Sequence, residues 1–410
     1  MKSINIKNVK NYNNKFYKYK TTICLAITFF IILIFNINIF AVTDDVDNNQ
    51  TENINNISID DIYQKQLEES NANNIYYSLP QETKNYLNKL GITSVSFSEL
   101  NSLSFGAVLN ALLQMFSENS TTPLSAVAQV IGIILLCALV DSMKTTLNDK
   151  PLGGIVSIIG TLCVSCVLVF PITKCIVTAS NIIQTSANFM ILFVPILTGV
   201  LVASGNALTG ATYYNVMMVT AQSVTLTSAN IIVPFMNVFL SLSIVGAVTS
   251  KINLDGVCDL FAKLTKWILT FVMSIFVSVL SFQTIISAVA DKTSVRATRF
   301  AISSVVPLVG GALSDAFLTV QSCITMLKSG VGVFVIISAF FIFLPIIFEC
   351  IIWIFTLNIC SAIGQMFNIS IICKILNNSS KVVTTLLAVL LCFLAVFIIS
   401  STLILIVRSS

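Results

Sequence analysis

The stretch AVADKTSVRATRFAISSVVPLVGGALSDAFLTV, residues 288–320, places charges and helix-breaking residues between long apolar runs. Its notable positions are Asp291, Lys292, Arg296, Arg299, Pro307, Gly310, Gly311 and Asp315. A carboxylate at the centre of a bilayer costs about 2.5–3.5 kcal/mol on insertion scales. Pro and Gly weaken a helix, which lipid tolerates only where protein or water satisfies the freed backbone groups. The stretch therefore predicts a segment that is buried in protein or lines a cavity, and it is our candidate functional segment.

The rest of the chain has the composition of a membrane protein. Of its 410 residues, 56% are apolar and only 10% are charged, whereas an average soluble domain has about 25% charged residues. Apolar runs of roughly the 20 residues needed to cross a bilayer follow one another from Leu124. We therefore expect an all-α, polytopic membrane bundle of about seven to nine spans. The runs are 124–142, 152–173, 182–203, 213–250 (long enough for two spans, hinged near Pro234), 267–290, 300–327, 331–357 and 382–407.

The first 42 residues have the pattern of a secretory signal. A Lys-rich start is followed by the apolar stretch Thr21–Phe40, and acidic residues follow Ala41. Ile39 makes a poor cleavage site, and the apolar stretch is about long enough to span a bilayer. The pattern therefore fits both a cleaved signal peptide and an uncleaved signal anchor. Both place residues 43–122 outside the cytoplasm, because the lysines stay inside.

Residues 43–122 form the one sizeable polar region and hold eleven of the eighteen acidic residues. Capping-box spacings at Ser78–Gln81 and Ser96–Glu99 predict helices in its second half. Apolar residues recur at helical spacing over Leu100–Met115. This amphipathic helix has three interpretations, which are binding to the membrane surface, to a partner, or to the chain's own membrane domain. We divide the chain into 1–42 (signal), 43–122 (acidic extracytoplasmic region) and 123–410 (membrane domain).

The positive charges give conflicting orientations around run 267–290. Lys251, Lys263 and Lys266 precede the run, and Lys292, Arg296 and Arg299 follow it. Basic residues favour the cytoplasmic side, yet a single crossing separates the two ends of a span. Either this run is not a simple span, or one basic cluster faces outward.

The residue inventory argues against the common catalytic and metal sites. The chain has no His, no GxxxxGK phosphate-binding loop and no GxSxG nucleophile motif. Its eleven Cys are scattered, mostly in apolar spans, where they act as small apolar side chains. We expect no enzymatic activity, no cofactor, no metal site and no nucleic-acid partner.

Charged residues in apolar surroundings are the remaining candidates, namely Asp141, Asp315, Lys328 and Glu349. One hypothesis is a proton or ion relay through Asp315 and Glu349. The structural alternative pairs Asp315 with Lys328 or a loop Arg, or uses Asp315 to cap a broken helix. A third places Asp315 at a subunit interface or a pore.

The segment Gln283–Val320 resembles the stage III sporulation protein AE family of endospore-forming bacteria. The shared features are Ala290–Asp291, Arg296, Arg299–Phe300, Pro307–Gly310 and Asp315–Ala316. The resemblance continues through Leu327–Gly332 and, more loosely, over residues 95–407. The family often has a second acid where this chain has Leu318, which weakens any proposal that needs two carboxylates in this segment.

The resemblance implies a non-enzymatic role in sporulation. Members belong to a transenvelope complex of A-operon stage III proteins with the forespore stage II protein Q. That complex looks like a channel or secretion apparatus needed for late forespore gene expression. The resemblance places the chain in the mother-cell membrane that becomes the outer forespore membrane. Two alternatives remain, a stand-alone small-molecule or ion transporter with its site around Asp315, and a binding module whose residues 43–122 dock partners.

Overall fold

The computed structural model describes residues 65–96, 99–100, 103–147, 152–248, 255–305 and 310–406. Every regular element within these ranges is a helix, and the described residues contain no strand. The all-α prediction is therefore confirmed. The predicted signal at 1–42 lies outside the described residues.

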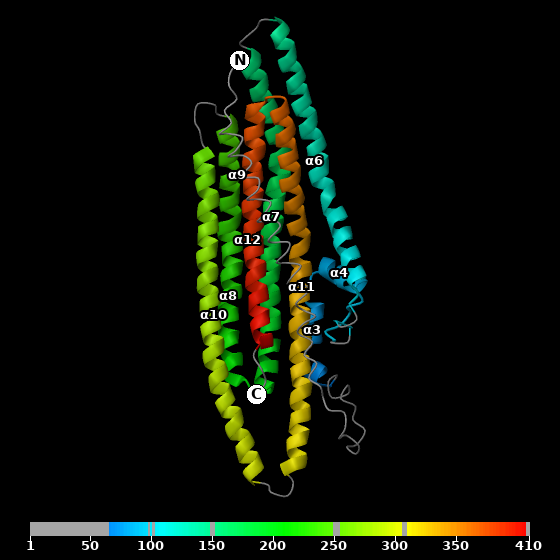
Figure 1. Ribbon diagram of the computed structural model, residues 1–410, viewed down its shortest axis with the longest axis vertical. Helices are drawn as coiled ribbons and strands as arrows, with labels where there is room; N and C mark the ends of the chain where they lie inside the picture. Colours follow the sequence, from blue (N-terminus) through cyan, green and yellow to red (C-terminus); the bar gives the residue numbers. More distant parts are fainter. Residues whose placement is uncertain are drawn as a thin grey trace. The chain divides into compact units, whose positions relative to one another are not determined.

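Two short helices precede a series of long ones. The short helices are α3 (Asn73–Tyr77) and α4 (Gln81–Lys89). The long series consists of α6 (Phe105–Leu147), α7 (Leu152–Ala203), α8 (Ala207–Thr227), the π-helical turn η1 (Ser228–Ile232), α9 (Val233–Val248), α10 (Asp255–Val305), α11 (Gly310–Met366) and α12 (Ser370–Ile406). The long helices run alternately up and down, side by side (Figure 1).

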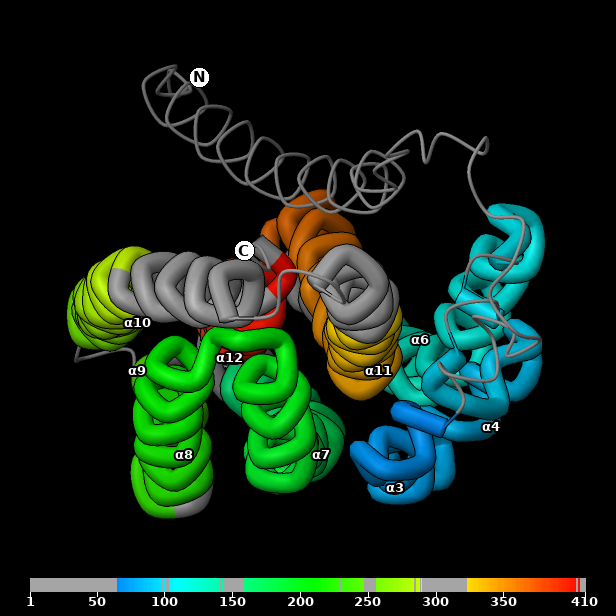
Figure 2. Tube along the Cα trace, turned by 90° about the horizontal axis from the view of Figure 1, so that it is seen from below, coloured from blue at the N-terminus to red at the C-terminus, as the bar shows by residue number. Residues whose placement is uncertain are grey.

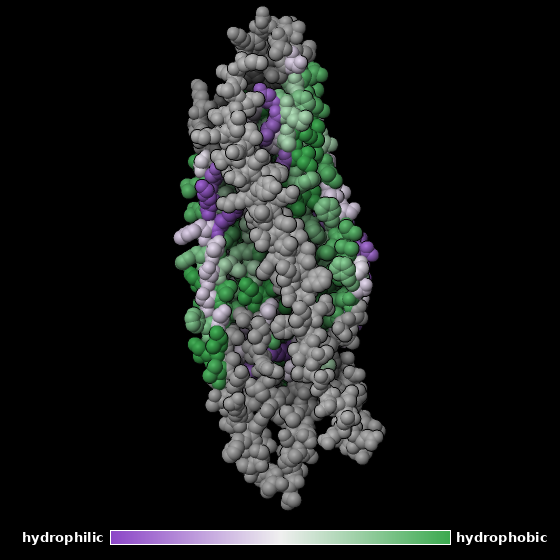
Figure 3. Space-filling model, in the orientation of Figure 1, coloured by the Kyte–Doolittle hydropathy of each residue, from purple (hydrophilic) through white to green (hydrophobic). Residues whose placement is uncertain are grey.

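Six helical stretches among the described residues are long and apolar enough to cross a membrane, with α8, η1 and α9 counted as one. Large apolar side chains remain exposed along them, and hydrophobic surface covers much of the described face (Figure 3). A chain with this surface is a multi-pass membrane protein. The predicted total of seven to nine spans stays a prediction.

The helices are longer than the apolar runs suggested. Runs 152–173 and 182–203 both lie on α7, which has 52 residues and is about 78 Å long at 1.5 Å per residue. The polar residues between the two runs do not end the helix, since their backbone hydrogen bonds are made within it and α8, α9, α11 and α12 pack against it. Run 300–327 is divided between the end of α10 and the start of α11.

The core of the bundle lies around α11 and α12. In the most apolar 18-residue stretch of each helix, 78% of the residues of α11 and 61% of those of α12 are buried, against 6% for α10. Viewed along the bundle, α12 lies among α7, α9, α10 and α11 (Figure 2). Phe397 of α12 packs on Phe189 and Phe193 of α7, with ring centroids 5.9 and 5.4 Å apart. Lipid is as apolar as these rings, so close packing rather than escape from water stabilises such contacts.

A pair of buried serines joins the middle of α7 to η1. The hydroxyls of Ser180 and Ser228 lie 2.7 Å apart, and Ser228 donates to the backbone carbonyl of Ser180 at 2.9 Å. The sequence allows two spans hinged near Pro234, whereas α8, η1 and α9 form one candidate span whose irregularity is this π-helical turn at Ser228–Ile232. The serines thus fix the irregular turn to a neighbouring helix.

Candidate functional site

The candidate segment lies where α10 gives way to α11. Asp291, Arg296 and Arg299 belong to the last turns of α10. Gly310 and Gly311 begin α11, and Asp315 follows in its second turn. Pro307 lies outside the described residues, and for the other positions the structure describes the backbone only. The two glycines therefore start a helix and do not interrupt one.

The continuity of α11 corrects two of the pairings considered for Asp315. Glu349 follows Asp315 by 34 positions and Lys328 by 13 on the same helix. At 1.5 Å per residue the separations along the axis are about 51 and 20 Å. Neither a direct relay to Glu349 nor an ion pair with Lys328 is possible over these distances.

Of the other charged candidates, Asp141 lies on α6, and Lys328 and Glu349 are buried to different degrees in the bundle. Lys328 is 3% exposed on α11. Glu349 is partly buried and lies within electrostatic reach of Lys174 on α7, with Trp353 one turn further along α11. The next residues, Cys175 and Cys350, bring their sulfur atoms within 3.8 Å of each other. The structure thus associates Glu349 with α7 and not with the segment around Asp315.

The N-terminal region, residues 65–119, docks on α11 through three aromatic pairs. Phe334, Phe341 and Phe348 recur every seven residues and so share one face of α11; we call them the aromatic ladder. Their partners are Tyr76 of α3, Tyr86 of α4 and Phe116 of α6, at centroid distances of 6.3, 6.5 and 6.1 Å. Among the three interpretations of the amphipathic helix, packing on the chain's own membrane domain is therefore confirmed.

Hydrogen bonds hold the N-terminal region together. The Tyr86 hydroxyl donates to Glu118, and the Tyr76 hydroxyl donates to Asn88. Burial, followed by this bond to Glu118, raises the pKa of Tyr86 well above its usual value, so the phenol stays protonated.

The amphipathic helix and the first predicted span form one continuous helix, α6.

The carboxylate of Glu99 organises the turn before α6. It accepts the backbone N–H groups of Thr93 and Ser94 at 2.8 and 2.9 Å. Partial burial acts in the opposite direction, but these hydrogen bonds prevail and lower the pKa of Glu99. These bonds differ from the capping box that the Ser96–Glu99 spacing predicts, in which Glu99 would accept the backbone N–H of Ser96.

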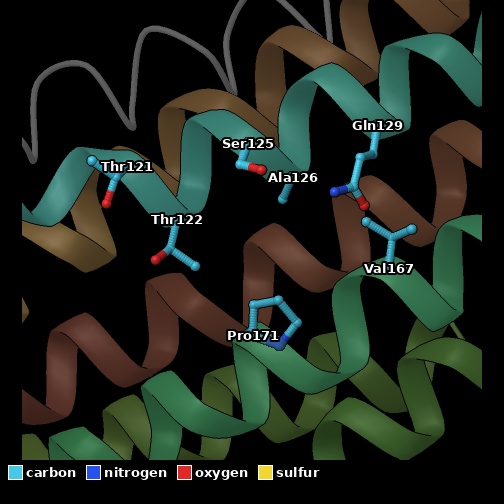
Figure 4. Close-up of a pocket in the computed structure, with 7 residues that line it drawn as sticks. All are labelled: Thr121, Thr122, Ser125, Ala126, Gln129, Val167 and Pro171. Atoms are coloured by element: carbon cyan, nitrogen blue, oxygen red, sulfur yellow. The ribbon is translucent and has the colours of Figure 1, made fainter.

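A polar notch opens between α6 and α7 (Figure 4). Its volume is about 340 Å³, and its lining residues are Thr121, Thr122, Ser125, Ala126, Gln129, Val167 and Pro171. Pro171 has no N–H, so the carbonyl of Val167 four residues earlier lacks its helical partner. The notch thus combines hydroxyls, a carboxamide and a released carbonyl on otherwise apolar helices.

The aromatic ladder and the notch were not predicted from the sequence, although signals for both are present in it. The period of seven in Phe334, Phe341 and Phe348 is readable in the sequence, as is the polar spacing of Thr122, Ser125 and Gln129. Neither pattern identifies the helix that packs against it. That partner is known only from the tertiary structure. No group of three or more His, Cys, Asp or Glu placed to hold a metal occurs within the described ranges.

Residues 92–408 match the family model described as stage III sporulation protein AE. The chain is also similar to the stage III sporulation protein AE of Bacillus subtilis (strain 168), with 29% identity over 155 residues. That alignment covers 38% of this chain and 39% of the relative, well under half of either protein. No solved structure matches the chain.

Proposed function

This chain belongs to the stage III sporulation protein AE family, and from that premise we propose that it is a non-enzymatic membrane component of the complex joining mother cell and forespore. Its partners would be the other A-operon stage III proteins and, through them, the forespore stage II protein Q. Its location would be the mother-cell membrane that becomes the outer forespore membrane. The family match over residues 92–408, which includes nearly all of the membrane helices, carries this proposal.

The docking of the N-terminal region supports a scaffold role within that complex. The aromatic ladder holds α3, α4 and the start of α6 along one face of α11. The polar surface of this region is thereby connected directly to the most deeply buried membrane helices. A scaffold needs such a connection, because a partner bound on the N-terminal region is then fixed relative to the bundle.

A deletion strain tests the proposal. We expect spore development to stop after engulfment, with a late forespore reporter gene silent and restored by the wild-type copy. A fluorescent fusion should move with the engulfing mother-cell membrane. Normal spore numbers and normal reporter activity in the deletion strain would refute the proposed function.

The rival function, a stand-alone transporter with its site at Asp315, makes a different prediction. A transporter requires that Asp315→Asn abolish sporulation while the protein still accumulates and assembles. The scaffold hypothesis expects the same variant to sporulate, or to fail only in proportion to a lower protein level. Immunoblotting of the membrane fraction beside spore counts distinguishes the two.

A further inference from the structure

The notch lies where α6 and α7 both change from polar to apolar sequence. On α6 the polar residues up to Pro123 give way to the apolar run that begins at Leu124. On the neighbouring α7 the apolar run 152–173 ends at Lys174. If runs 124–142 and 152–173 are the parts of α6 and α7 that cross the bilayer, this border lies at the depth of the lipid headgroups.

Three of the polar side chains that line the notch have no partner among the described residues, whereas the fourth, Thr121, donates to the carbonyl of Glu118. The side chains of Thr122, Ser125 and Gln129 make no hydrogen bond to another described residue. The carbonyl of Val167 is released by Pro171. Donors and acceptors left unpaired next to hydrocarbon are costly, so a hydrogen-bonding ligand at this position would be stabilised.

The surroundings of the notch fit an amphiphilic ligand with a negative charge. Lys174 continues the face of α7 that carries Val167 and Pro171, at positions i, i+4 and i+7; it is exposed, and Glu349 of α11 lies within its electrostatic reach. Beyond the notch on its apolar side, Leu136, Ile159 and Leu162 are exposed by 65%, 54% and 48%. A cation, neutral hydrogen-bonding groups and an apolar surface thus follow one another along the two helices.

We infer that the notch between α6 and α7 binds the headgroup of an anionic glycerophospholipid. The Lys174 ammonium attracts the phosphate, while the hydroxyls and the carboxamide bind the glycerol and ester oxygens. The acyl chains lie on the exposed apolar residues below. A volume of about 340 Å³ is at the lower end of ligand pockets, which suits a headgroup but not a whole lipid. The site is independent of the chain's role in any complex.

Lipid titration of the full-length chain, purified in a mild non-ionic detergent, tests the inference. The probes are phosphatidylglycerol, phosphatidylcholine and inorganic phosphate, with the thermal midpoint and the retained lipid as readouts. Phosphatidylglycerol should raise the midpoint, phosphatidylcholine should do so only weakly, and phosphate should have no effect. Lys174→Gln and Ser125→Val should each weaken the phosphatidylglycerol response about tenfold, as for the loss of one strong contact.

Matched variants on the exposed side of α10 provide the controls. Lys266→Gln and Thr270→Val remove the same chemical groups from exposed positions away from the notch, and both should respond like the wild type. Equal losses in the control and notch variants would overturn the assignment. So would a full response to phosphate alone, which indicates free phosphate, or an equal response to phosphatidylcholine. Each variant's midpoint without lipid shows whether it still folds.

Discussion

At the residue scale, the best-defined polar interactions hold irregular backbone in place. Glu99 satisfies the backbone N–H groups ahead of α6, and Ser180 with Ser228 fixes the π-helical turn between α8 and α9. In both cases an irregular backbone segment leaves groups that a regular helix would pair. These side chains therefore determine local geometry more than they determine the fold.

The hydrogen bonds to Glu99 make the N-terminal region sensitive to acid. The lowered pKa means that their stabilisation is fully present above the ordinary carboxyl pKa of 4.5 and is lost as the pH falls through the folded value. Glu99→Gln should behave at neutral pH as the wild type does in acid, with faster proteolysis between residues 90 and 104. Gln81→Glu, which adds a carboxyl at the start of α4, is the control; equal pH profiles for Glu99→Gln and wild type would contradict the assignment.

The serine pair should show energetic coupling. Ser228→Ala removes the hydroxyl that bonds Ser180 and leaves the Ser180 hydroxyl only its longer bond, 3.2 Å, to the Ser228 carbonyl, so a cost of about 1–3 kcal/mol is expected. The double variant with Ser180→Ala should cost less than the sum of the single changes, since either change alone already removes the contact between the two hydroxyls. Thermal midpoints in one detergent supply the comparison, and strictly additive losses would show that the hydroxyls act separately.

At the scale of elements, α11 organises the molecule. One of its faces carries the aromatic ladder for the N-terminal region, and other faces pack on α6, α7 and α12. An amphipathic helix has one apolar face, whereas α11 needs several and is accordingly apolar almost all round. Its central position follows from this composition.

Removing one rung of the ladder should loosen the N-terminal region. Phe341→Ala deletes the ring that stacks on Tyr86, and an aromatic pair contributes about 0.5–1.5 kcal/mol beyond its area burial. Protease sites in residues 65–104 should be cut several-fold faster, with the long helices still protected. Phe355→Ala on α11, which is 66% exposed, is the matched control and should cleave like the wild type.

Glycine positions on α7 should respond oppositely to the same substitution. A Cβ at Gly160 would contact the Cys137 sulfur and lie 3.2 Å from Ile372, whereas a Cβ at Gly199 meets nothing within 4 Å. Gly199→Ala should therefore stabilise the helix by up to about 1 kcal/mol. Gly160→Ala should lower the thermal midpoint, because α6 and α12 would each have to move away from α7. A midpoint raised by both changes would show that α6, α7 and α12 do not meet closely there.

The sequence predicted the helical class, the membrane location and the family, since composition and the residues around Asp291 and Pro307 carry those signals. It did not predict that two apolar runs share one helix, as on α7. Hydropathy records only the polar residues between the runs, while helix continuity depends on backbone bonds and neighbours. The notch and the ladder were missed for a related reason, because each needs a partner helix distant in sequence.

At the scale of the whole molecule, the two basic clusters that precede and follow run 267–290 constrain how α10 crosses the membrane. Lys263 and Thr293 lie 30 residues apart on this one helix, or about 45 Å along its axis, more than the roughly 30 Å of hydrocarbon. If α10 crosses the membrane, its basic ends lie on opposite sides. One cluster then faces away from the cytoplasm.

Cysteine labelling tests this arrangement. In a background without native cysteines, Lys263→Cys and Thr293→Cys should react with an impermeant maleimide from opposite faces of the membrane. Inverted vesicles should give the reverse pattern to intact cells. Both positions labelling from the same face would show that α10 does not cross.

The length of α11 has a consequence for the space around the membrane. Its 57 residues extend about 85 Å, so roughly 55 Å of rod remains beyond a 30 Å hydrocarbon layer. A continuous helix cannot be shortened without breaking its backbone hydrogen bonds. If it projects on one side only, a facing membrane cannot approach closer than that length. The protein would then act as a spacer that sets the width of an intermembrane gap.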